Sequence, residues 1–125
     1  MSPRAAGATA HELSRVELLA ALPGETLAKL AQAMRREDVA AGAAVVSEGD
    51  DGDRFYVVLR GMLAVSQQSR GPQSVLRPGD YFGEVALAMN IPRTASVRAL
   101  TPATVASCDR ATFDAFIRPL FADDD

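Results

Sequence analysis

Near the start of the chain the apolar residues recur at helical spacing, and after Arg36 they fall in short runs. From Ser14 they occupy one helical face until Pro23 and Gly24 interrupt the pattern, and a second helix follows. The apolar positions of these two helices are Val16, Leu19 and Leu22, then Leu27, Leu30, Ala31 and Met34. Residues 1–10 have no such periodicity, and the sequence predicts a disordered N-terminal tail there.

After Arg36 the chain consists of short runs of β-branched, aromatic and other apolar residues, separated by Gly and Pro turns. The predicted strands are 44–47, 54–59, 62–66, 74–76, 96–100 and 104–108. A short helical piece is expected at 83–89, and a helix at 109–117 is capped by Asp109. Short strands with helices at both ends of the chain predict an α+β fold, with the strands in a sandwich or roll.

The composition narrows the partners and the compartment. A chain of 125 residues with 48% apolar residues fits one domain with its own core. The net charge of −3 and the scattered basic residues argue against a nucleic-acid partner. Cys108, the single cysteine, suits a reducing cytoplasm, and with His11 as the single histidine no protein-ligated metal site is expected. No apolar run approaches the ~20 residues of a membrane span, so no direct membrane insertion is expected.

Residues 82–99, FGEVALAMNIPRTASVRA, combine groups that suit one particular kind of ligand. Gly83 permits a close backbone approach and begins a short helix whose free N–H groups suit an anion. Arg93 offers a planar cation for phosphate oxygens, Thr94 adds a hydroxyl, and Ala95 leaves its backbone N–H accessible. Glu84 would repel a phosphate, but it would accept a hydrogen bond from a hydroxyl of the same ligand. A phosphate with a nearby hydroxyl is a ribose phosphate, so the segment indicates a nucleotide.

The same segment resembles the phosphate-binding cassette of the cyclic nucleotide-binding domain family. FGEVAL spans Phe82 to Leu87, and PRTASV spans Pro92 to Val97. The motifs are most similar to those of kinase regulatory subunits and cyclic nucleotide-gated channels. EGDDGDRFYVVLRG and LRPGDYFGE resemble two further family motifs, and the likeness extends over about residues 18–117. It implies an eight-stranded antiparallel β-roll, jelly-roll-like, flanked by N-terminal helices and a short C-terminal helix.

The resemblance also implies a role for each residue that matches the family's motif. Glu84 would accept from the ribose 2′-hydroxyl, and Arg93 would pair with the cyclic phosphate. The backbone or hydroxyl contacts around the phosphate would come from Gly83, Ala86, Thr94 and Ala95. The base would lie against Val65, Ser74 and Leu76. No cofactor is required, and the ligand would be cyclic AMP or cyclic GMP: Thr94 permits both, and the family favours cyclic AMP.

The ends of the chain set the expected domain boundaries. The binding domain is expected at residues 11–118, followed by a C-terminal tail at 119–125. Arg118 and Pro119 are expected to interrupt the last helix. The residues after them are too few for the long helix with which the family covers the base. Phe121 is the one apolar candidate there for covering part of the base. With the base end open, we expect poor selectivity between the two bases.

A regulatory role follows from the resemblance. The domain would act as a sensor in the cytoplasm, or at the cytoplasmic face of a membrane. Its effector, a transporter, channel or enzyme, would lie outside this sequence. No catalytic arrangement is visible, so the chain is not expected to be an enzyme.

Several alternatives stay open at this stage. Glu84 and Arg93 could form an ordinary surface salt bridge. The chain could be a ligand-free protein–protein interaction module on the same roll. The acids of EGDDGD could suggest a calcium loop, but Gly49 and Gly52 favour a turn, because the ligand spacing of a calcium loop is missing.

Overall fold

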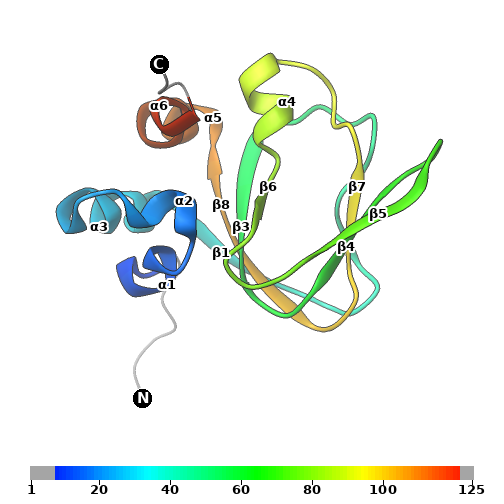
Figure 1. Ribbon diagram of the computed structural model, residues 1–125, viewed down its shortest axis with the longest axis horizontal. Helices are drawn as coiled ribbons and strands as arrows, with labels where there is room; N and C mark the ends of the chain where they lie inside the picture. Colours follow the sequence, from blue (N-terminus) through cyan, green and yellow to red (C-terminus); the bar gives the residue numbers. More distant parts are fainter. Residues whose placement is uncertain (1–7, 122–125) are drawn as a thin grey trace.

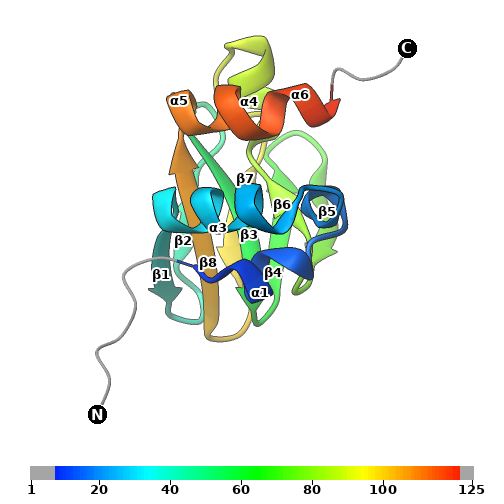
Figure 2. The same ribbon diagram turned by 90° about the vertical axis from the view of Figure 1, so that its left-hand side faces the viewer.

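The computed structural model describes residues 8–121, which fold into two β-sheets with helices on one side. The N-terminal helices are α1 (Ala10–Ser14), α2 (Glu17–Ala20) and α3 (Gly24–Ala33). A helical run at the other end comprises α5 (Arg110–Thr112), the π-helix Phe113–Ile117 and α6 (Arg118–Phe121). Figure 1 shows these helices on one side of the strands, and Figure 2 shows them from the front.

The strands form two antiparallel, four-stranded sheets. One sheet has the order β1-β8-β3-β6 and the other β2-β7-β4-β5. Their bounds are β1 (Arg35–Val39), β2 (Ala44–Val46), β3 (Arg54–Arg60), β4 (Leu63–Gln67), β5 (Gly71–Leu76), β6 (Tyr81–Phe82), β7 (Ser96–Ala99) and β8 (Ala103–Asp109). The predicted α+β roll of eight strands with flanking helices is therefore confirmed.

Strand β3 separates two apolar clusters, because its successive side chains point to opposite faces. Phe55 and Val57 pack with the helices on the outer side. Tyr56 and Val58 face the second sheet, where they pack among residues such as Leu63. Strand β3 therefore packs against the helices with one face and against the second sheet with the other.

The N-terminal helix begins earlier than predicted. The Thr9 hydroxyl accepts a hydrogen bond from the Glu12 N–H at 3.1 Å, and the Glu12 carboxylate accepts one from the Thr9 N–H at 3.0 Å. This capping box starts α1 at Ala10, and Ala8 is buried. The predicted disordered tail is thus wrong for residues 8–10, while residues 1–7 lie outside the described residues.

Two strands were not predicted from the pattern. Strand β1, RREDV, is mostly polar, because it is an edge strand whose only partner is β8. Its Arg36 also binds the Glu12 carboxylate of α1 at 2.6 Å. Strand β6 has only two residues, too few for an alternating pattern. Both strands form through their pairing with β8 or β3, which is information that no local run contains.

The last helix continues where an interruption was expected. The run of helical residues extends through Pro119 to Phe121. Pro119 lies directly after the wider π-helical turn Phe113–Ile117, where the regular α-helical bonding is already interrupted and a missing N–H is tolerated. The prediction that Arg118 and Pro119 break the helix is wrong, and residues 122–125 lie outside the described residues.

Candidate functional site

A pocket of about 240 Å³ opens between the two sheets beside helix α4 (Glu84–Met89). The helix follows Gly83, which adopts the left-handed conformation with φ +95°. Helix α4 thus confirms the predicted helical piece at 83–89, except that Gly83 is its cap. The lining residues are Val46, Val65, Leu76, Tyr81, Phe82, Gly83, Glu84, Val85, Ala86, Arg93, Thr94, Ala95 and Val97. All six predicted contact residues of the cassette are among them.

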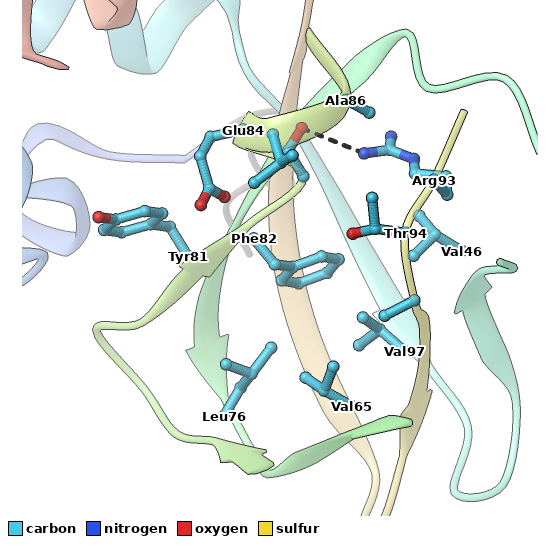
Figure 3. A pocket seen from close by; sticks show the side chains of 13 residues that line it. Val46, Val65, Leu76, Tyr81, Phe82, Glu84, Ala86, Arg93, Thr94 and Val97 are labelled. Carbon is cyan, nitrogen blue, oxygen red and sulfur yellow. Dashed lines mark hydrogen bonds between the residues drawn. The ribbon is translucent and has the colours of Figure 1, made fainter. Parts of the chain in front are cut away.

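The Arg93 side chain forms one end of the pocket (Figure 3). It is only 6% exposed. Its Nη1 donates to the Gly83 carbonyl at 3.2 Å, its Nη2 donates to the Arg54 carbonyl at 2.8 Å, and its Cζ lies 5.7 Å from the centre of the Tyr56 ring. Within residues 8–121 it has no carboxylate within 4.0 Å. The guanidinium is therefore fixed and buried without a counterion.

The backbone of Arg93 is held by the loop EGDDGD. The Arg93 N–H donates to the Asp50 carbonyl at 2.7 Å, and the Gly49 N–H donates to the Arg93 carbonyl at 2.8 Å. Gly49 has φ +91°, as the predicted turn requires. Through these two hydrogen bonds the loop supports the backbone of Arg93. No cluster of metal-ligating side chains occurs in the described part of the chain.

Gly52 belongs to the site for a reason that the sequence did not reveal. A Cβ atom at this position would lie 2.5 Å from the Ala86 Cβ and 3.0 Å from the Arg93 Cζ. Its backbone does not need a positive φ, so it is the close approach and not a turn that requires glycine. Such a requirement depends on residues far along the chain, and a local pattern gives no signal for it.

Glu84 lies across the pocket from Arg93 (Figure 3). It forms no salt bridge with Arg93, which removes the alternative of a simple surface pair. The side chain is half-buried, and desolvation raises the pKa of Glu84, although its own backbone N–H and the distant Arg93 charge partly offset this. The carboxylate is thus a costly group that points into a cavity.

Thr94, Ala95 and Ala86 complete the wall near Arg93. The Thr94 carbonyl accepts a hydrogen bond from Gln67 Nε2 at 2.8 Å, which fixes the segment to strand β4. Thr94 is exposed, Ala95 is half-buried, and Ala86 is buried under Gly52. Gln67 was not predicted, because it acts through a backbone atom and leaves no motif.

The far end of the pocket is apolar. Val65 and Leu76, two of the three predicted base contacts, line it. Ser74 does not: it is exposed, and it lies opposite Val65 in the β4–β5 pairing without lining the pocket. The unpredicted residues of this wall are Val46, Tyr81, Phe82 and Val97. Phe82 is buried, at 7% exposure.

Cys108, the single cysteine, does not line the pocket. Cys108 is fully buried, and desolvation raises the pKa of its thiol to about 12, so it is an inert core residue. No helix among residues 8–121 is long and apolar enough to span a membrane.

Comparison with known sequences gives one family. The sequence model of the cyclic nucleotide-binding domain matches residues 36–119. A cAMP-dependent protein kinase regulatory subunit of Eremothecium gossypii is 41% identical over 108 residues, covering 86% of this chain and 24% of that protein. The chain thus spans about a quarter of the length of such relatives.

Solved structures give the same fold. The regulatory domain of Toxoplasma gondii PKA with cAMP aligns with a TM-score of 0.82 and 32% identity, covering 89% of this chain and 44% of that one. The N-terminal domain of a transcriptional regulator from Streptomyces coelicolor A3(2) aligns with a TM-score of 0.75 and 32% identity, covering 86% of this chain and 81% of that one.

Proposed function

This chain belongs to the cyclic nucleotide-binding domain family, and we propose that it binds a cyclic nucleotide, preferably cyclic AMP, in the pocket beside α4. Arg93 pairs with the cyclic phosphate, and Glu84 accepts a hydrogen bond from the ribose 2′-hydroxyl. Gly83, Ala86, Thr94 and Ala95 surround the phosphate. The site binds its ligand and carries out no reaction on it.

The observation that carries this proposal is the buried charge of Arg93, which forms no salt bridge within residues 8–121. Desolvation lowers the pKa of Arg93, and more distant charges such as those of Asp53, Asp50 and Glu84 only partly offset this. A guanidinium at 6% exposure with no carboxylate within 4.0 Å lowers the stability of the folded protein, unless a bound anion offsets the cost of its burial. Two of its N–H groups are used by the Gly83 and Arg54 carbonyls, and the others are free for phosphate oxygens. A cyclic phosphate is a singly charged anion that suits this position.

Glu84 supports a ribose as the group next to the phosphate. The raised pKa of Glu84 shows that its carboxylate loses solvation in the pocket, and a ligand hydroxyl would restore one hydrogen bond. Because Glu84 lies across the pocket from Arg93, its carboxylate stays away from the phosphate that Arg93 binds. The pair therefore selects a ligand with an anion at one side and a hydroxyl at the other.

The base lies against the apolar end of the pocket. Val65, Leu76 and Phe82 offer it hydrophobic contact and no hydrogen-bond partner. An apolar wall discriminates weakly between ligands that differ in polar groups. Cyclic GMP is therefore bound as well, with Thr94 and Tyr81 as the residues with hydroxyl groups that line the pocket and can select between the two.

The ligand acts as a signal for an effector. The relatives named above include a kinase regulatory subunit and a transcriptional regulator, so this fold controls more than one kind of effector. Since the chain spans about a quarter of the kinase relatives, its own effector is a further proposal: a domain or partner that responds when the pocket fills.

A thermal-shift screen with cyclic AMP, cyclic GMP and linear AMP tests this function. We expect both cyclic nucleotides to stabilise the protein and linear AMP, with its second phosphate charge and open ring, to do so far less. A preference of a hundredfold between the cyclic pair would contradict the apolar base site.

The second candidate is a ligand-free interaction module on the same roll. Its one supporting feature is the exposed apolar strip of Val85, Met89 and Ile91 beside the pocket. In that case no nucleotide would change the melting temperature, and Arg93→Ala would have no effect on any nucleotide titration.

A further inference from the structure

The face of the Tyr56 ring lies against the one cation of the pocket. Tyr56 is on strand β3, where it is 8% exposed, and the Arg93 Cζ lies over its ring at 5.7 Å from the centroid. This is within the range in which a ring quadrupole attracts a cation, and the attraction is strongest when both groups are desolvated. Arg93 is desolvated to the same degree.

Tyr56 is itself held in a fixed plane. Its ring stacks on Phe82, with the centroids 4.8 Å apart and 3° between the planes. Phe82 lines the pocket, so the stack runs from Arg93 through Tyr56 to the apolar wall. Tyr56 does not line the pocket, and it can act on a ligand only through Arg93.

The other negative groups around Arg93 are two carbonyl oxygens in contact and the more distant carboxylates of Asp53, Asp50 and Glu84, whose charges partly offset its desolvation. The Gly83 and Arg54 carbonyls accept hydrogen bonds from two N–H groups, which lie in the guanidinium plane. These bonds do not support the face of the guanidinium. Within residues 8–121 no carboxylate is within 4.0 Å. The ring face therefore adds an attractive contact close to the cation without occupying the N–H groups that a phosphate needs.

We propose that Tyr56 is a positioning residue, whose ring face holds the Arg93 guanidinium in its binding-ready place before the ligand arrives. This rests on the proposed function of the pocket. A carboxylate in the place of the ring would compete with the phosphate for Arg93. A ring attracts the guanidinium through its face and leaves the N–H edge of the guanidinium free for the phosphate. The aromatic face, and not the tyrosine hydroxyl, provides the effect.

A series of isosteric rings at position 56 tests the proposal. Tyr56→Phe keeps the face and loses the hydroxyl, and fluorinated phenylalanines at the same position weaken the face step by step with little change in volume. The same fluorinated series at Phe55, the neighbouring residue on the opposite side of β3, is the matched control, since Phe55 packs against the helices and does not touch Arg93.

We expect Tyr56→Phe to bind cyclic AMP almost as the wild type does, and the trifluorinated ring to bind about tenfold more weakly. The Phe55 series should leave the dissociation constant unchanged. A flat series at position 56, or a loss in Tyr56→Phe as large as in the trifluorinated variant, would overturn the proposal.

A second readout needs no ligand. In the free protein, the Arg93 Nε–H should exchange slowly with water by NMR, and fluorination at position 56 should speed this exchange. If the wild type binds no cyclic nucleotide, the proposed function fails, while this exchange still decides the role of Tyr56. If fluorination leaves the exchange unchanged, Tyr56 does not hold the guanidinium.

Discussion

Two glycines from different segments surround the Arg93 guanidinium. A Cβ at Gly83 would lie 2.8 Å from Arg93 Nη1 and 2.9 Å from the Arg54 carbonyl oxygen, and one at Gly52 would lie 3.0 Å from Arg93 Cζ and Nε. At the residue scale, the site is thus defined as much by missing side chains as by charged ones. The space that they leave is what lets a buried cation reach the pocket.

The first prediction concerns Gly52. In Gly52→Ala the new methyl group would lie 2.5 Å from the Ala86 Cβ, so α4 and the Arg93 side chain must move apart. We expect cyclic AMP to bind at least about tenfold more weakly, since small misplacements of binding groups are costly. Calorimetric titration measures this. The matched control is Gly24→Ala on α3, which has no atom within 4 Å and should bind as the wild type does.

The second prediction concerns Glu84 and pH. Burial raises the pKa of Glu84 above its ordinary value of 4.5, so on raising the pH the unfolded chain releases this proton before the folded one. Ionised Glu84 therefore destabilises the free protein above about pH 4.5. Glu84→Gln should melt at a higher temperature than the wild type at pH 7, with the difference disappearing at pH 4.

The same variant should lose affinity, because a charge-assisted hydrogen bond to the ribose is replaced by a neutral one; we expect about tenfold. Stability and binding would thus change in opposite directions. A variant that was less stable than the wild type at pH 7 would show that the Glu84 charge is not strained in the free protein.

At the scale of elements, the C-terminal helical run is fastened to the ligand-binding helix. Arg110 and Arg118 both donate to the Leu87 carbonyl, at 3.1 and 3.2 Å, and Arg118 also reaches the Ala88 carbonyl at 3.3 Å. Cations at the end of a helix stabilise its free carbonyls. We therefore expect a movement of α4 on binding to be passed on to α5 and α6.

The third prediction tests this connection. Arg118→Ala removes two donors from the end of α4 and the contact with Phe113, whose ring lies 5.5 Å from the guanidinium. Hydrogen–deuterium exchange should become faster in both α4 and α6, and cyclic AMP should protect α4 without protecting α6. Arg35→Ala, at an exposed position of β1, is the control. Protection of α6 that survived in Arg118→Ala would refute the coupling.

Elements with their own local pattern were predictable, and elements held by distant partners were not. Strand β3 and the last helical run have strong apolar patterns, and both begin where predicted, although the helical run continues past Ile117 to Phe121. Strand β1 is polar and depends on its pairing with β8, and the helical residues after Ile117 are tied to α4 by Arg118. The cassette residues were predictable from their motif, whereas Gly52, Gln67 and Tyr56 act through atoms that only the fold brings together.

At the scale of the whole molecule, the ligand and the fold stabilise each other. Arg93 takes its partners from β3, α4 and the loop before β3, so filling the pocket links segments that are far apart in the sequence. The fourth prediction follows from this linkage. At a cyclic AMP concentration a hundredfold above the dissociation constant, the free energy of unfolding should rise by about 2.7 kcal/mol. For a domain of this size the melting temperature should rise by roughly 8–12 °C.

That shift should be absent in Arg93→Ala at the same cyclic AMP concentration, while the variant stays folded. Arg93→Ala in the free state should not be much less stable than the wild type, because the substitution also removes a buried charge that has no salt-bridge partner within residues 8–121. A ligand-dependent shift of equal size in the variant would place the bound nucleotide somewhere other than this pocket.

The most direct test of the central claim is isothermal titration of the wild type and of Arg93→Ala with cyclic AMP. We predict one-to-one binding with measurable heat for the wild type and no detectable binding for Arg93→Ala. Equal binding by the two proteins, or no binding of either cyclic nucleotide by the wild type, would contradict the claim that this buried arginine is the phosphate site.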